Sequence, residues 1–145
     1  MRKKYFFIAG IVVIFLGIIG GGYGWYLFHK PHAGVSGVTA VARMGAADLY
    51  NGFQQNETGA DKQYLGQVLE VEGRVSDVAR TDSTCSVELE GGTGAAGGIN
   101  CSIAADAESK MPLPPKGAVV TIKGRCTGFL MDVNLVDCVI QNIKQ

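Results

Sequence analysis

The longest apolar run in the chain covers residues 5–28, and none of these 24 residues is charged. A basic start, Met1-Arg-Lys-Lys4, precedes the run, and His29 and Lys30 follow it. As an α-helix at about 1.5 Å per residue, the run would extend for about 36 Å, which exceeds the ~30 Å hydrocarbon core of a bilayer. The pattern predicts a transmembrane anchor within residues 1–30.

The distribution of positive charge gives the anchor a direction. Lys and Arg are enriched on the cytoplasmic side of membrane helices, so we expect the N-terminus inside and the C-terminal domain outside. A cleaved signal peptide is the alternative, but its apolar region is usually about 7–15 residues long and ends at a small-x-small site. The best such site, Ala40-Val41-Ala42, lies well beyond the run. We therefore expect a single-pass protein of the bacterial inner (cytoplasmic) membrane.

Glycines on the predicted anchor form two small-xxx-small pairs, Gly17/Gly21 and Gly20/Gly24. Such pairs let two helices approach closely, which would make a homodimer through the anchor. Glycine is also simply common in membrane helices, so this pattern leaves both interpretations open.

The pattern then changes twice. Residues 31–44 have no apolar period and are expected to be a tether, which leaves residues 45–145 as one small domain. Residues 45–64 place apolar side chains on one helical face, at Leu49, Phe53, Ala60 and Tyr64. This spacing predicts a helix that ends before Gly66.

From residue 67 onward, apolar and polar positions alternate, as in half-buried strands. Strands are predicted over residues 67–80, 84–90, 99–103, 118–126 and 131–140. The Gly-rich segment 91–98 is expected to connect two of them, residues 104–110 a short helix, and Pro112–Pro115 a break. This order predicts a mainly β (α+β) domain, a helix-capped five-stranded Greek-key barrel of the OB type. A two-sheet sandwich is the alternative, but it usually needs about seven strands.

Charge and composition disfavour several classes of function. The formal net charge of zero conceals an acidic domain, because residues 45–145 hold eight Lys and Arg against thirteen Asp and Glu, a net −5. The second and third predicted strands carry Glu88 and Glu90 and no aromatic side chain, so nucleic-acid binding is disfavoured. Both histidines, His29 and His32, precede the domain, and there is no Cys-x-x-Cys pair. We expect no catalytic site, metal or cofactor.

Several stretches resemble the tRNA-anticodon-binding-like (tRNA_anti-like) OB-fold family of bacterial membrane and exported proteins. The resemblance spans roughly residues 45–142 and is carried by Leu49-Tyr50, Phe53, Asn56-Glu57, Ala60-Asp61, Tyr64, Gly66, the strand segments 68–75 and 99–103, and above all residues 120–138. It implies an OB fold behind a signal or membrane anchor. The family name records a fold similarity rather than a tRNA-binding role.

Two sets of residues in this resemblance are candidate sites. Asn56, Glu57 and Asp61 form a polar cluster that either contacts a ligand or bonds to backbone at the open end of the barrel. Cys126 and Cys138 belong to the family pattern and flank the last hairpin, which makes them the disulfide candidate, although a turn at 127–130 would not place them opposite each other. Buried free thiols are the alternative for all four cysteines.

The expected function is a membrane-anchored, non-catalytic OB module that faces the exterior or periplasm and binds a protein or an envelope glycan or peptide. The alternatives are a structural or assembly protein whose anchor self-associates, and an oligonucleotide-binding OB domain. The sequence does not name the ligand.

Overall fold

The computed structural model describes residues 2–28, 35–81, 84–103 and 112–144. It divides the chain into two compact units, Met1–His32 and Ala33–Gln145. The predicted short helix at 104–110 lies outside the described residues.

The first unit is the helix α1, Arg2–Phe28. Its described side chains, at residue 8 and residues 10–26, are all exposed, and most are apolar. Within the described residues, no helix meets the length and apolarity needed to cross a membrane. The helix itself is where the sequence predicted one, and its role as an anchor is not confirmed.

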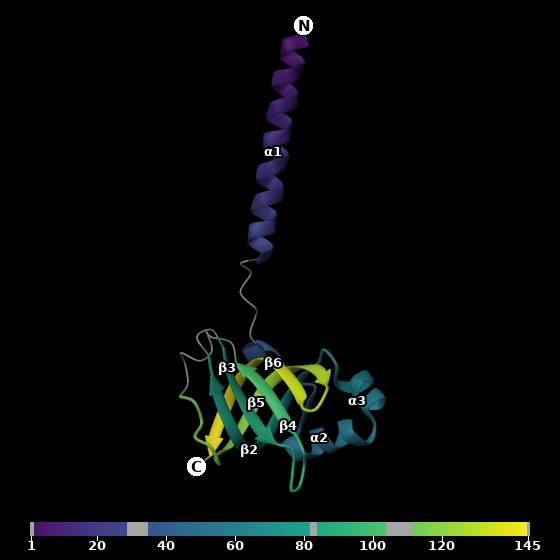
Figure 1. The fold of residues 1–145 in the computed structure, drawn as a ribbon, viewed down its shortest axis with the longest axis vertical. Helices are drawn as coiled ribbons and strands as arrows, with labels where there is room; N and C mark the ends of the chain where they lie inside the picture. The colour runs from purple at the N-terminus through teal and green to yellow at the C-terminus, as the bar shows by residue number, and fades with distance from the viewer. Residues whose placement is uncertain (1, 29–34, 82–83, 104–111, 145) are drawn as a thin grey trace. The chain divides into compact units, whose positions relative to one another are not determined.

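The second unit is a closed five-stranded barrel (Figure 1). Its strands are β2 Val68–Arg80, β3 Cys85–Glu90, β4 Gly98–Ile103, β5 Val119–Phe129 and β6 Val133–Lys144. They pair in the order β2-β3-β4-β6-β5, and β5 returns to β2. The β4–β6 pair is parallel and the other barrel pairs are antiparallel. The predicted OB-type Greek-key barrel is confirmed.

Residues before position 45 also belong to this unit, which differs from the predicted tether at 31–44. The strand β1, Ala42–Gly45, pairs in parallel with residues 69–72 of β2. A short 3-10 helix, η1 Val35–Gly37, buries Val35. Lys123 Nζ donates hydrogen bonds to the carbonyls of Ser36 and Val38, at 3.1 and 3.0 Å. A strand of four residues is too short to give a recognisable alternation, which is why the pattern did not reveal it.

The predicted single helix over 45–64 is wrong, because the structure has two helices there. They are α2, Ala46–Gln55, and α3, Glu57–Tyr64. The break falls at Asn56, whose side-chain Oδ1 accepts a hydrogen bond from the backbone N–H of Gly59 at 3.0 Å. Asn is a favoured N-cap because it satisfies a backbone donor that the first helical turn leaves unpaired. The apolar residues keep a helical spacing on both sides of Asn56, so periodicity alone predicted one helix.

The helices cover the barrel with an aromatic cluster. Phe53 is fully buried, and its ring centroid lies 5.7 Å from that of Phe129 at the end of β5 and 6.2 Å from that of Tyr64. Tyr50 meets Phe129 edge to face at 5.9 Å. These are all four aromatic residues of the domain, and they pack against one another around the helices α2 and α3.

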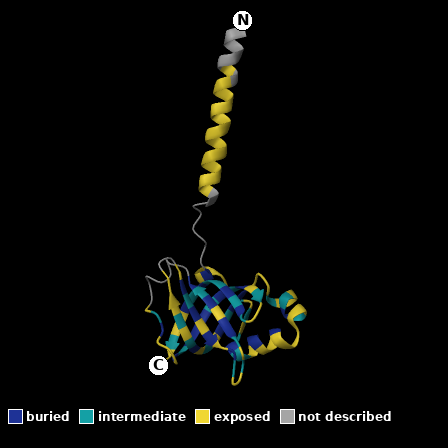
Figure 2. Cartoon of the chain, viewed as in Figure 1, coloured by how far each residue is buried: buried dark blue, intermediate teal, exposed yellow. Residues whose placement is uncertain are grey.

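Burial along most strands alternates as predicted, and Figure 2 shows the resulting checkered pattern. The alternation changes phase in β6, where Leu135 and Cys138 are both buried although they are three residues apart. Asp137 lies between them with φ of 54°, the left-handed region that non-glycine residues rarely adopt. The pairing of β6 with both neighbours shifts at this point, so Asp137 marks a β-bulge.

Because Phe53 joins both helices to the barrel, we expect Phe53→Ala to destabilise the domain by about 3–5 kcal/mol. Urea unfolding of residues 33–145, followed by far-UV circular dichroism, measures this loss. Gln55→Ala, at an exposed position of the same helix, is the matched control and should change the unfolding free energy by less than about 0.5 kcal/mol. Equal effects of the two changes would mean that the aromatic cluster does not hold the helices.

Candidate functional site

The turn between β5 and β6 exposes large apolar side chains. Leu130 is 85% exposed and Met131 75% exposed. The turn is tight, with a hydrogen bond from the Leu130 N–H to the Asp132 carbonyl at 3.2 Å, and Gly128 supplies a φ of 123° just before it. Phe129 points into the aromatic cluster, so the two residues that follow it are directed to solvent. We call Leu130 and Met131 the apolar tip.

A surface hollow of about 470 Å³ adjoins the apolar tip. It is lined by aliphatic, aromatic and polar side chains from α3, β5, β6 and the residues that follow α3 and β5: Asp61, Leu65, Thr127, Phe129, Leu130 and Asn134, with Gly128 between them. Leu65, which follows α3, is 51% exposed. Tip and hollow therefore form one mainly apolar surface at the helix-covered end of the β5–β6 hairpin, and we call it the tip hollow.

The polar groups of the tip hollow differ in how well they are satisfied. Thr127 Oγ1 donates to the Asn134 carbonyl at 3.2 Å, and Asn134 Nδ2 donates to the Asp132 carbonyl at 3.1 Å. Asp61 Oδ1, in contrast, is buried and has no hydrogen-bond partner among the described residues. Leaving a buried acceptor unpaired costs roughly 1–3 kcal/mol, and a ligand that brings an N–H or cationic donor would remove that cost.

The negative charge of Asp61 also affects the pKa of the buried Cys126 thiol. Burial is the main reason that the pKa of Cys126 lies above its ordinary value, and the negative charge of Asp61 raises it further. A hydrogen bond with the backbone of Gly128 acts in the opposite direction. Cys126 is therefore a neutral, buried thiol and not a nucleophile at neutral pH.

The predicted polar cluster separates into three roles. Asn56 is the helix cap described above, which matches the structural interpretation. Glu57 lies exposed in the first turn of α3 and does not line the hollow. Asp61 alone lies in the tip hollow. The apolar tip was not predicted as a site, although an apolar Leu130-Met131 pair at a predicted turn, where polar residues are usual, was the available signal.

The predicted disulfide between Cys126 and Cys138 is not present in the structure. Cys85, Cys101, Cys126 and Cys138 are all buried thiols, and none is joined in a disulfide. Cys126 lies opposite Leu135 in the β5–β6 ladder, whereas Cys138 lies three residues further along β6. Three residues of strand extend for roughly 10 Å, which exceeds the ~7 Å limit between the Cα atoms of a disulfide.

A second hollow, of about 360 Å³, lies on the outer side of β1, β2, β5 and β6. Its charges are paired with one another: Arg43 Nε lies 2.8 Å from Glu70 Oε1, and Lys144 Nζ lies 3.0 Å from Glu72 Oε2. Thr121 Oγ1 also donates to Glu72, at 3.3 Å. Because these charged groups pair with one another, they are less available to a ligand than the unpaired Asp61 oxygen of the tip hollow.

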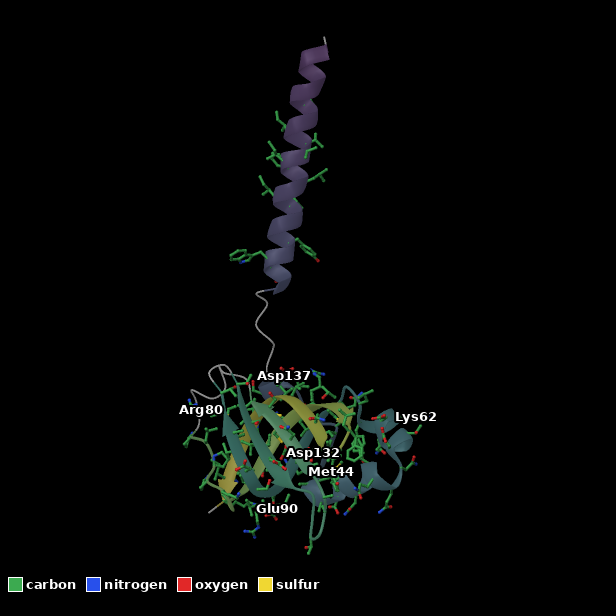
Figure 3. The ribbon with its side chains drawn as sticks, in the orientation of Figure 1. Met44, Lys62, Arg80, Glu90, Asp132 and Asp137 are labelled. Atoms are coloured by element: carbon green, nitrogen blue, oxygen red, sulfur yellow. The ribbon has the colours of Figure 1, made fainter. Side chains whose placement is uncertain are left out.

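The outer face of β3 and β4 is polar and acidic. Glu88, Glu90 and Asn100 are exposed there, and Figure 3 shows Glu90 at the rim of the barrel. Beneath the Gly-rich connection lies a hollow of about 170 Å³, and Asp132 Oδ1 fastens this connection by accepting from the Gly98 N–H at 2.8 Å. The connection joins β3 to β4, as predicted.

Two other predicted features lie outside these hollows. Gly17, Gly20, Gly21 and Gly24 all lie in α1, and a Cβ at any of them would meet no atom within 4 Å, so all four leave room for a neighbouring helix. In the described part of the chain, no three His, Cys, Asp or Glu side chains gather in a way that could hold a metal ion.

The Glu72–Lys144 ion pair gives a testable pH effect. The hydrogen bond from Lys144, and then its charge, lower the pKa of Glu72 below its ordinary value. A lowered folded-state pKa stabilises the fold above the unfolded pKa, and this stabilisation is lost as the pH falls through the folded value. We expect Lys144→Met to raise the pKa of Glu72, measured by NMR titration of its carboxyl. Lys116→Met, which removes a 3.9 Å contact to Asp77, should leave the pKa of Glu72 unchanged.

The chain is similar to known structures. A crystal structure of a "putative nucleic acid-binding lipoprotein" from Klebsiella pneumoniae is similar, with a TM-score of 0.58 and 18% identity over 68% of this chain and 91% of that one. The Stn1–Ten1 complex of S. pombe is a more distant match, with a TM-score of 0.40 and 15% identity over 53% of this chain and 56% of that one. The first likeness shows the fold alone. No curated protein matches the sequence. The model of the tRNA_anti-like family matches residues 1–140, so the chain belongs to the tRNA_anti-like family.

Proposed function

We propose that this protein is a membrane-attached, non-catalytic binding module that holds a protein or peptide partner at the tip hollow. The observation that carries this proposal is the exposure of Leu130 and Met131 beside a hollow with an unpaired buried carboxylate oxygen. Aliphatic side chains at a tight turn gain nothing from facing water, and exposed apolar patches rimmed by polar groups mark interaction sites.

The chemistry of the tip hollow favours a polypeptide over the other ligands of OB folds. Single-stranded nucleic acids and glycans are usually bound by several exposed aromatic faces or a basic groove. Here the four aromatic side chains of the domain pack against one another around α2 and α3, and Phe129 is the one of them that also lines the tip hollow. The faces of β3 and β4 carry Glu88 and Glu90, which repel phosphates. Leu65 and the apolar tip offer aliphatic contacts, which suit the aliphatic side chains of a protein.

Charge adds a second criterion for the partner. Residues 45–145 carry a net charge of −5, so a basic partner would associate faster than a neutral one. Within the hollow, Asp61 Oδ1 is the acceptor that such a partner would satisfy with a Lys, Arg or backbone N–H donor. The expected ligand is therefore a segment that places an apolar side chain next to a cationic or N–H donor.

Membrane attachment is part of the proposal and is supported by the apolar surface of α1. Its exposed Ile, Val, Leu and Phe side chains need either lipid or another chain to cover them. The basic residues before the run favour a cytoplasmic N-terminus, and the domain would then lie on the outer side of the bacterial inner membrane. We further propose that the domain is not an enzyme, since it has no histidine for proton transfer.

The decisive experiment places a photoreactive amino acid at position 130 of the full-length protein in intact cells. We expect irradiation to join the protein to one protein partner, and Leu130→Ser with Met131→Ser to weaken binding of that partner at least about tenfold, equivalent to about 1.4 kcal/mol.

The matched control carries the same photoreactive amino acid at position 100, which is exposed on the β3–β4 face. A protein partner captured equally from both positions would contradict the assignment to the tip hollow. Nucleic acid captured from position 100 would instead support the oligonucleotide alternative.

The membrane part of the proposal has its own test. We expect the full-length protein to stay in the membrane fraction after alkaline washing, and a version lacking residues 1–30 to be released, because the apolar helix provides the attachment. Replacement of Gly17, Gly20, Gly21 and Gly24 by Leu should leave the attachment intact. If this replacement abolishes capture of the partner while the tip double variant does not, the structural role of a self-associating anchor is the better explanation.

A further inference from the structure

The apolar tip lies against the Gly-rich connection between β3 and β4, residues 91–98. A Cβ atom at Gly97 would lie 2.5 Å from the backbone carbonyl oxygen of Met131 and 2.6 Å from Asp132 Oδ1. Both distances are far below an ordinary contact, so a side chain at this position would force the two segments apart. The connection and the turn of the β5–β6 hairpin therefore meet backbone to backbone, although 34 residues separate Gly98 from Asp132 in the chain.

Asp132 joins the connection to the apolar tip. Its side-chain Oδ1 accepts the hydrogen bond from the Gly98 N–H at 2.8 Å. Its backbone carbonyl accepts from the Leu130 N–H at 3.2 Å and from Asn134 Nδ2 at 3.1 Å. The bonds to the carbonyl hold the turn itself, and the bond to the carboxylate links the turn to the connection. Truncation of the Asp132 side chain would therefore remove the link and leave the bonds within the turn.

Tyr50 supports the same connection. A Cβ atom at Gly91 would lie 2.9 Å from Tyr50 Cγ, and one at Gly97 would lie 3.2 Å from the Tyr50 hydroxyl, so both ends of the connection lie on this side chain. Tyr50 is buried, and its hydroxyl accepts a hydrogen bond from Gln54 Nε2 at 2.9 Å. Its ring also meets that of Phe129, the residue before the apolar tip. The tip thus has two supports, an aromatic one through Phe129 and a backbone one through the connection.

The backbone support acts on the direction of the tip and not on the lining of the hollow. None of the residues that line the tip hollow belongs to the connection. The connection therefore adds no contact inside the hollow, and its effect is to fix how Leu130 and Met131 project from the hairpin. Association costs free energy for each loop and side chain that it must order, so a turn that is already held in place avoids part of this cost.

We propose that Asp132 and Gly97 are positioning residues, through which the Gly-rich connection holds the apolar tip ready for its partner. The inference rests on the proposed function, because it takes the apolar tip as the surface that contacts a protein partner. Asp132 supplies the link between the two segments. The absence of a side chain at Gly97 supplies the space in which they meet.

Four variants of the full-length protein separate positioning from a general effect on folding. Asp132→Ala removes the acceptor for the Gly98 N–H, whereas Asp132→Asn keeps an acceptor oxygen and is the conservative rescue. Gly97→Ala introduces a Cβ atom, and the Met131 carbonyl must move by roughly 1 Å to restore an ordinary contact. Gly52→Ala is the matched control, because Gly52 is exposed in α2 and a Cβ atom there would meet no atom within 4 Å.

The first measurement needs no partner. Amide order parameters from ¹⁵N relaxation of the full-length protein in detergent report how firmly the tip is held. In Asp132→Ala and in Gly97→Ala we expect the values of Leu130 and Met131 to fall from about 0.85, typical of rigid backbone, to below about 0.6. Asp132→Asn should recover most of the order, and Gly52→Ala should leave it unchanged. The value of Ile122, in the core of β5, should stay the same in all four variants.

The second measurement uses the photoreactive amino acid at position 130 in intact cells. We expect Asp132→Ala and Gly97→Ala to lower the yield of captured partner at least about fivefold, equivalent to about 1 kcal/mol. Asp132→Asn should restore the larger part of the yield, and Gly52→Ala should capture as much partner as the unchanged protein. A loss of order at Ile122 would mark a variant as unfolded, and the other of the two disrupting variants would then decide.

The outcomes distinguish a failure of this inference from a failure of the proposed function. If the unchanged protein captures no protein at position 130, the proposed function fails and the inference fails with it. If the unchanged protein captures a partner and the folded disrupting variants capture it equally well, only the positioning role is wrong. Order parameters of Leu130 and Met131 that stay the same in both disrupting variants would also overturn the positioning role.

Discussion

Strand β2 pairs with β5 over residues 68–74 and with β3 over residues 75–80, and this double pairing makes the sheet a barrel. The strand must bend where it passes from one partner to the other, and Gly73 lies at the bend. A Cβ at Gly73 would come within 2.6 Å of the Ala46 Cβ, so the absence of a side chain lets the start of α2 lie directly on the strand. Closure of the barrel and the seating of the helix thus depend on the same short stretch of β2.

Seating α2 on β2 determines what the rest of the domain exposes. Phe53 and Tyr50 on this helix hold Phe129 at the end of β5 through aromatic contacts. Once Phe129 is fixed inward and Gly128 has turned the chain, Leu130 and Met131 have no interior left to enter. The apolar tip is therefore a consequence of the aromatic cluster, and the helices position the proposed binding surface although most of that surface lies on the β5–β6 hairpin.

The sequence predicted the barrel because its strands keep a period of two, from Leu69 and Val71 in β2 to Ile99 and Cys101 in β4. It missed the helix break because Asn56 interrupts the backbone without disturbing the apolar spacing on either side. It offered Cys126 and Cys138 as a disulfide pair, whereas the ladder sets Cys126 opposite Leu135 and leaves Cys138 three residues further along β6. The bulge at Asp137 between Leu135 and Cys138 is not indicated by any residue type in the sequence. Of the predicted polar cluster, only Asp61 lies in the tip hollow, since carboxylate burial depends on contacts between distant strands and helices.

The placement of aromatic side chains separates this domain from OB folds that stack bases or sugars. Here the aromatic residues stabilise the helix-covered end of the barrel, and the face of β3 and β4 is left with glutamates and short polar side chains. At the proposed binding surface Phe129 is a partly exposed aromatic ring, and its neighbours offer aliphatic contact and charge. Leu65, the apolar tip and the unpaired oxygen of Asp61 supply aliphatic contact and charge at one surface, which the helices and the β5–β6 hairpin build together.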